Sequence, residues 1–364
     1  MILEPDGTEV DWFVGYSAPP EKYQEQVDRA LQGIDTFLSL SARYAKEPKN
    51  VEVIFKLAGK YGRRNKPETA TELYKQIIAL DPDGKLGTTE FNKEKVSYTQ
   101  NAEFNLGTMA MSSRPPDPAP LQAFIKKYPG GALVKEAFTR LSSFYGRTAT
   151  KEEATKFFEE FTARFPKDYD SYNAWVSRIL FDKDPLDKGI SLAQKAIELV
   201  ELAKEIPRVN PYISLAQLYL LKGDKVKASE TADRMMKFAS MPAEAARIYA
   251  DAGQVDKALA VYGPEYLKKI IDNAQLLGRY AQFWSSQSQN LESALEAAKK
   301  ATELTPDGYS AWNILSQVYQ KHKNYGEALK AAEKALSLAP DQPPQIKESV
   351  KKNIEAIKAA LEKK

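Results

Sequence analysis

The residues that could catalyse a reaction or bind a metal are few in this chain. It contains one histidine and no cysteine, so it has no thiol nucleophile, no disulfide and no zinc–thiolate site. The histidine, His322, lies in the segment Lys321–Asn324. A lone histidine lacks the partners that a catalytic triad or a zinc site needs. We interpret His322 as a solvent-exposed turn residue, and we expect no metal and no cofactor.

Two charged segments resemble ligand-binding loops only in part. Asp81-Pro82-Asp83-Gly84 begins like a calcium-binding loop, but Lys85 stands where an oxygen ligand is needed and the glycine comes too early. We interpret it as a helix stop followed by a turn. The segment Gly59–Arg64 contains two arginines and a lysine but no glycine-rich phosphate loop. We interpret these cations as a solvent-exposed face of a helix.

Neighbouring carboxylates offer no acid–base pair either. Glu152 and Glu153 are adjacent in the sequence, as are Glu159 and Glu160, and adjacent residues on a helix do not face each other. The sequence therefore predicts that the chain is not an enzyme.

Composition narrows the function further. The 364 residues include 52 Lys+Arg and 49 Asp+Glu, which leaves a net charge of +3. This balance is too even for a nucleic-acid-binding protein, whose cations gather on one face. No run approaches the roughly 18 apolar residues of a membrane span, and Met1–Tyr16 lacks the basic and apolar regions of a signal peptide. We expect a soluble chain; its compartment stays open.

A pattern of large and small residues recurs along most of the chain. In Tyr309–Gln342, large residues recur at helical spacing in the first half, small residues follow in the second, and a proline ends the unit. Small residues allow two helices to approach closely, and large ones fill the space between neighbouring pairs. The residues that carry this pattern are Trp312, Leu315, Tyr319, Ala328, Ala332, Ala335 and Pro340.

This pattern resembles the tetratricopeptide repeat, with Ser316 standing where that motif favours glycine. The same frame fits eight units, which begin near residues 51, 100, 135, 169, 209, 239, 275 and 309. Those at Gln100–Leu133 and near Tyr169–Leu202 are degenerate, the first because a proline-rich segment separates its helices. Trp284 falls outside the frame. The resemblance implies an all-α fold, a right-handed α-solenoid of about eight helix pairs over residues 51–342, followed by a capping helix at 343–364.

The N-terminal segment does not follow the repeat. Residues 1–20 predict a β-hairpin, with a first strand from Ile2, a turn at Pro5-Asp6-Gly7 and a second strand over Val10–Tyr16. A helix is expected to begin at Pro19-Pro20 and to continue to about Arg43, within a connecting segment at 21–50. Because a two-stranded ribbon is marginal alone, we expect the hairpin either to fold back onto the first helices or to pair two copies of the chain as a homodimer.

The order of these elements resembles the last third of a thioredoxin-like domain, through Leu3-Glu-Pro-Asp-Gly7 and Val14-Gly-Tyr16. The redox cysteines and the cis-proline of that family lie upstream of such a segment and have no counterpart here. One interpretation is that the chain is a piece of a longer parent. The other is a native hairpin that caps the solenoid.

The tetratricopeptide resemblance also implies where a ligand binds. In that family the first helix of each pair lines a groove, and arginine, amide and aromatic side chains there could bind a peptide through its backbone and carboxylates. The alternative for each is a solvated polar residue. No three consecutive units carry the family's carboxylate clamp for chaperone tails. The groove candidates are Phe55, Arg178, Gln217, Arg247, Arg279, Phe283, Asn313 and Gln317.

Two functions follow from these observations. The first is a scaffold that binds a protein or peptide of unknown identity. The second is the client-binding or oligomerisation half of a larger thioredoxin-like oxidoreductase.

Overall fold

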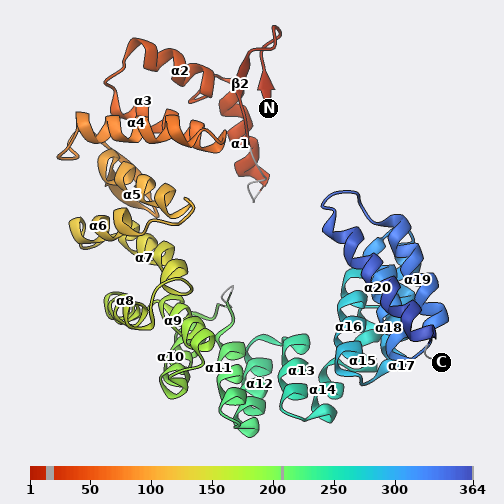
Figure 1. Ribbon diagram of the computed structural model, residues 1–364. Helices are drawn as coiled ribbons and strands as arrows, with labels where there is room; N and C mark the ends of the chain where they lie inside the picture. The colour runs from red at the N-terminus through yellow and green to blue at the C-terminus, as the bar shows by residue number, and fades with distance from the viewer. Residues whose placement is uncertain (14–19, 206–208, 363–364) are drawn as a thin grey trace. The chain divides into compact units, whose positions relative to one another are not determined.

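The computed structural model describes residues 1–13, 20–205 and 209–362. These residues are nearly all helical (Figure 1). They form two compact units, Met1–Arg178 and Ile179–Lys364. The sequence predicts a single solenoid over residues 51–342, and the boundary between the two units falls within it, after Arg178.

The N-terminal unit begins with an antiparallel hairpin and two helices, and three complete helix pairs follow. A second hairpin is inserted after the first pair, and helix α9 runs from this unit into the next. The elements are β1 Ile2–Leu3, β2 Glu9–Asp11, α1 Pro20–Leu31, α2 Phe37–Lys46, α3 Val51–Arg63, α4 Pro67–Leu80, β3 Thr88–Phe91, β4 Glu94–Ser97, α5 Tyr98–Met111, α6 Ala119–Lys127, α7 Ala132–Tyr145, α8 Lys151–Arg164 and α9 Tyr169–Asp182.

The C-terminal unit continues the pairs without strands among its described residues. Its helices are α10 Leu186–Ala203, α11 Pro211–Leu221, α12 Lys225–Ala239, α13 Pro242–Asp251, α14 Val255–Tyr262, α15 Pro264–Lys269, α16 Ala274–Gln287, α17 Leu291–Leu304, α18 Tyr309–Lys321, α19 Tyr325–Leu338 and α20 Gln345–Glu362. Apart from α1, α2, α15 and α20, the described helices form eight consecutive pairs, so the predicted helical-repeat fold is confirmed.

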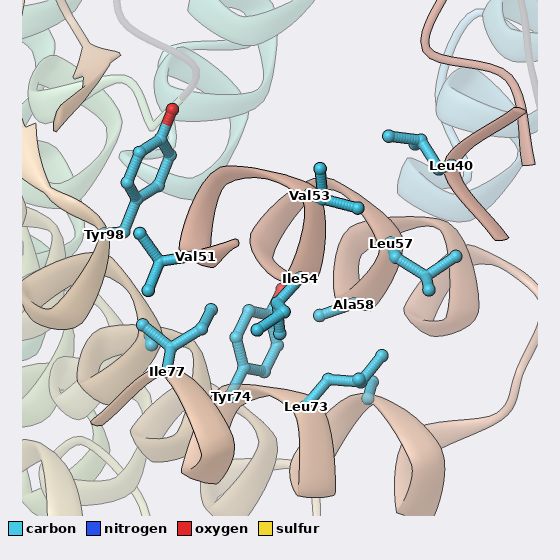
Figure 2. Close-up of a cluster of buried hydrophobic side chains, with 12 residues drawn as sticks. Leu40, Val51, Val53, Ile54, Leu57, Ala58, Leu73, Tyr74, Ile77 and Tyr98 are labelled. Carbon is cyan, nitrogen blue, oxygen red and sulfur yellow. The ribbon is translucent and has the colours of Figure 1, made fainter. Parts of the chain in front are cut away.

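The first pair shows how the repeat pattern produces a core. Asn50 caps α3 by accepting a hydrogen bond from the Val53 amide, and Pro67 opens α4 in the first turn, where no amide donor is needed. Ala58 and Ala70 are fully buried, which allows α3 and α4 to approach closely. Figure 2 shows the larger side chains that fill the space around them, among them Leu40, Val51, Ile54, Leu57, Leu73, Tyr74, Ile77 and Tyr98.

The connecting segment differs from the expected single helix. Gly33 has φ 71° and Asp35 has φ 53°, values outside the helical region. Thr36 then starts a new helix, α2, through a capping box with Ser39. The segment therefore holds two helices because a glycine turn and a strong helix start lie within it.

The N-terminal hairpin is shorter than expected. Its second strand ends at Asp11, and the predicted strand residues Val14–Tyr16 lie outside the described residues. Strand β2 packs against α2, and its acidic side chains contact α3. The hairpin thus folds back onto the first helices, which is one of the two expected outcomes. Pairing between two copies stays a prediction.

The second hairpin, β3–β4, was not expected from the sequence. Its strands pair in register from Thr88 opposite Ser97 to Phe91 opposite Glu94. Asn92 and Lys93, between the strands, both have positive φ, 49° and 67°, as a two-residue hairpin turn requires. The hairpin separates the first helix pair from α5.

Candidate functional site

The predicted groove residues of the C-terminal unit lie on four first helices that are neighbours in space. Helix α11 contacts α13, α13 contacts α16, and α16 contacts α18. Local sequence signals start these helices: Asn210 and Asn273 cap α11 and α16 with their side chains, and Pro211 and Pro242 occupy the first turns of α11 and α13. The four helices therefore form a continuous surface.

Small residues let these first helices pack closely against each other and against the second helices. A side chain added at Gly278 would meet the Ile314 side chain at 3.2 Å, so α16 and α18 are in close contact there. The Ser316 hydroxyl donates to the carbonyl oxygen of Ala328 at 2.8 Å. This bond explains why serine is accepted where the motif favours glycine, since its buried hydroxyl has a partner.

The opposite side of the same helices presents polar groups. Gln217, Arg247, Arg279 and Gln317 are exposed, and Asn313 is half-buried. The Arg247 guanidinium is 4.0 Å from the Asp251 carboxylate, and its side chain remains 71% exposed. Amides donate to and accept from a peptide backbone, and guanidinium groups pair with carboxylates.

Phe283 lies at the same surface but is held by aromatic neighbours. Its ring centroid is 5.4 Å from that of Tyr262 and 4.8 Å from that of Trp284. Trp284 is fully buried, and its indole N–H donates to the Tyr262 carbonyl oxygen at 2.8 Å. The residue that fell outside the repeat frame is therefore part of the core, and Phe283 contributes a half-buried apolar contact to the surface.

Arg178 does not belong to an accessible surface. It is 6% exposed, and its guanidinium donates to the carbonyl oxygens of Tyr145 at 2.8 Å and Ala149 at 2.9 Å. Both carbonyls lie where α7 ends and the chain turns toward α8, so Arg178 satisfies buried backbone acceptors. We correct its assignment from a groove residue to a structural one; its one-residue offset from the frame was the signal.

His322 also has a structural contact that the sequence analysis missed. Its Nε2 lies 2.9 Å from the carbonyl oxygen of Leu291, in the preceding pair, and its side chain is 17% exposed. The expected solvated turn residue is instead a link between α18 and the start of α17.

Two of the three cations in Gly59–Arg64 are not part of the solvent-exposed face that the sequence suggested, whereas Arg63 is exposed. Lys60 and Arg64 contact the carboxylate of Asp11, and Arg64 also contacts Glu9. Asp11 is 1% exposed. Burial alone raises the pKa of Asp11, but hydrogen bonds from Lys60, the Trp12 amide and Arg64 outweigh it and hold that pKa below its usual value. These ion pairs attach the N-terminal hairpin to α3.

Phe55 lies nearby, in the core and at the edge of a cavity. Its ring is 6.1 Å from Tyr74 and 5.2 Å from Tyr98. The cavity measures about 540 Å³ and lies between the hairpin and α1–α4. Sequence analysis did not predict it, because it depends on how the hairpin and α1 pack on the first pair.

No cluster of three or more metal-ligating side chains occurs in the described part of the chain. Asp81 instead closes a turn, because its carboxylate accepts hydrogen bonds from the amides of Lys85 at 2.7 Å and Leu86 at 3.0 Å. A search of residues 1–13, 20–205 and 209–362 found no helix with the length and apolar character needed to cross a membrane.

Comparison with known proteins places the chain among helical-repeat proteins. A family model described as ChAPs (Chs5p-Arf1p-binding proteins) matches residues 184–335. Yeast Tom70 superimposes with a TM-score of 0.50 at 17% identity, over 96% of this chain and 67% of that one. A tetratricopeptide repeat protein from Parabacteroides merdae ATCC 43184 gives a TM-score of 0.43 at 12% identity, over 85% and 98% of the two chains. No curated protein matches. At these identities the similarity concerns the fold, which is of the tetratricopeptide type.

Proposed function

We propose that the chain is a non-catalytic scaffold that binds a protein or an extended peptide on the first-helix surface of its C-terminal unit. The observation that carries this proposal is the exposure of Gln217, Arg247, Arg279 and Gln317 on consecutive first helices. Their chemistry suits the backbone and the carboxylates of a peptide. The ChAPs match covers this region, and the name of that family describes protein-binding members.

A selection experiment tests this proposal. A phage-displayed dodecapeptide library is selected on the immobilised full chain, and the affinities of selected peptides are measured by calorimetry. We expect the double variant Arg247→Ala/Arg279→Ala to bind at least about tenfold more weakly, since charge-assisted contacts contribute on this scale. The matched control is Lys237→Ala/Lys334→Ala, which removes two exposed cations from the second helices α12 and α19. Equal loss in both double variants, or none in either, contradicts the proposal.

The thioredoxin-like interpretation remains a second proposal, supported by the order hairpin, then helix, at the N-terminus. It predicts that the genomic sequence encoding the residues before Met1 contains a Cys-x-x-Cys motif. The chain itself has no thiol, so we expect no insulin reduction by the pure protein. Reduction by this chain contradicts the non-catalytic assignment.

A further inference from the structure

The cavity beside Phe55 has the size and the lining of a ligand site. Its volume of about 540 Å³ lies within the range of about 300–1,000 Å³ that is usual for small-ligand pockets. Its described lining includes four aromatic residues: Trp12 and Phe13 after the hairpin, Phe55 on α3 and Tyr74 on α4. Aromatic walls of this kind take up a large apolar side chain.

Cations outnumber carboxylates among the described lining residues of the cavity, although Glu52, outside the lining, also pairs with Lys56 at 2.7 Å. The described lining residues include four cations, Arg29, Lys56, Lys60 and Arg63, and two carboxylates, those of Asp11 and Asp35. Three of these cations form ion pairs with the two carboxylates. Arg29 and Lys56 each lie 3.0 Å from the Asp35 carboxylate, and Lys60 pairs with Asp11.

Arg63 is exposed, and it has no ion-pair partner among the residues that the structure describes. An anionic group is therefore the expected complement at this rim.

The hydroxyl of Tyr74 adds a hydrogen-bond donor to the same cavity. Tyr74 is 6% exposed, and its hydroxyl has no protein hydrogen-bond partner within the described residues. Burial raises the pKa of Tyr74 to about 12, although the positive charge of Arg63 opposes this, so the hydroxyl keeps its proton. A neutral hydroxyl without a partner in a lined cavity is available to a ligand oxygen.

The lining of the cavity includes a helical glycine that no described protein atom approaches closely. Gly59 lies within α3 and lines the cavity, and a Cβ at this position would meet nothing within 4 Å. Glycine is less favourable than alanine inside a helix, and neither Gly59 nor Gly62, which lies outside the cavity, packs closely against a described neighbour. The missing side chain of Gly59 leaves space in the cavity for an occupant.

We propose that this cavity binds an acidic peptide segment of another protein, with an aromatic side chain between the four rings and a carboxylate on Arg63. A peptide is favoured over a free small molecule because Arg63 is exposed at the rim, so the chain on either side of the acidic residue continues into solvent. The site lies in the N-terminal unit and is separate from the surface proposed above.

The test uses the full chain and a fluorescein-labelled peptide, Gly-Ser-Gly-Trp-Glu-Gly-Ser-amide, whose anisotropy reports binding. Its counterpart with Gln in place of Glu measures the contribution of the carboxylate. We expect the wild-type chain to bind the acidic peptide at least about fivefold more tightly than the neutral one. No preference for the acidic peptide overturns the proposal.

Two matched pairs of variants locate the binding site. Gly59→Leu places a side chain in the cavity and is expected to weaken binding at least about tenfold without lowering the melting temperature, because leucine is the better helix former. Gly62→Leu makes the same change on the same helix, at an exposed position outside the cavity lining where a Cβ also meets nothing within 4 Å. It is expected to bind like the wild type.

The second pair concerns charge. Arg63→Gln should abolish the preference for the acidic peptide, whereas Lys75→Gln, which removes an exposed cation of α4, should leave it unchanged. Full binding by Gly59→Leu overturns the cavity proposal. If Arg247→Ala/Arg279→Ala loses this peptide while Gly59→Leu keeps it, the peptide binds the C-terminal unit; the cavity proposal then fails and the proposed function stands.

Discussion

The hairpin β1–β2 and the helix α20 each pack against a helix pair, but through different chemistry. The hairpin contacts α3 and the residue after it through charged side chains: the buried Asp11 pairs with Lys60 and Arg64, and the half-buried Glu9 pairs with Arg64. Helix α20 contacts the α18–α19 pair with apolar side chains: Val350, Ile354 and Ile357 are 3%, 8% and 0% exposed. The hairpin is therefore attached by ion pairs, and α20 is attached by apolar contacts.

This difference predicts different energetic roles. Burial of apolar surface is favourable in proportion to its area. A buried ion pair loses most of its attraction to desolvation, but removing one partner is costly because the other charge is left unpaired. Helix α20 should therefore contribute stability, and the hairpin ion pairs should mainly fix where the hairpin lies.

Truncation tests this comparison with the largest expected effect. Deleting residues 345–364 uncovers the apolar face of α19, and we expect the free energy of unfolding of the C-terminal unit to fall by about 3 kcal/mol or more. Deleting residues 1–18 leaves Lys60 and Arg64 facing water, where they are readily solvated, so the helix pairs should stay folded. Urea unfolding followed by circular dichroism measures both. If the second deletion unfolds the array, the hairpin is a structural cap.

A single substitution in α20 tests whether its buried side chains, rather than the helix as a whole, stabilise the C-terminal unit. Ile357→Ala removes a fully buried side chain and should cost about 2–4 kcal/mol. Leu361→Ala on the same helix, where the side chain is 39% exposed, should stay within about 0.5 kcal/mol of the wild type. Equal unfolding midpoints for the two variants would show that α20 does not contribute through apolar burial.

The helix pairs were predictable because each carries its own core pattern. Small residues such as Ala70, Ala154 and Ala328 occupy the predicted close contacts and are almost fully buried. This pattern depends on spacing along one pair, which the sequence displays directly.

Contacts between elements far apart in the sequence were not predictable in the same way. Lys60 and Arg64 look like a solvated helix face until Asp11 is known to lie opposite them, 49 and 53 residues away. Arg178 resembles a groove residue until the carbonyl of Ala149 is placed beside its guanidinium. The cavity at Gly59 has the same origin, although two glycines within one helix were a visible sign.

Asp11→Asn tests the ionic attachment with a smaller expected effect. The amide keeps the shape of the carboxylate but leaves Lys60 and Arg64 without their shared anion, so the attachment of the hairpin should weaken by about 1–3 kcal/mol. Amide hydrogen exchange in β2 measures this loss. Glu4→Gln is the control, since Glu4 is exposed and lies in the same hairpin. Unchanged exchange in Asp11→Asn contradicts the role of the ion pairs.

Acid should release the hairpin before it affects α20, and this is the smallest effect that we expect. The pKa of Asp11 in the folded chain lies below its usual value, so its contribution is complete above the unfolded pKa of about 3.9 and is lost as pH falls through the lower folded value. The charged groups that face Asp11 are Lys60 and Arg64, and Glu9 pairs with the same arginine. The buried side chains of α20, Val350, Ile354 and Ile357, carry no titratable group.

Labelling with 5-fluorotryptophan measures this difference. The ¹⁹F resonance of Trp12, which follows β2, should shift at acid pH. The resonance of Trp312, which packs against the α19–α20 core, should keep its position. In Asp11→Asn the same Trp12 transition should be reduced or absent; a transition that persists unchanged in this variant would assign the acid sensitivity to another group.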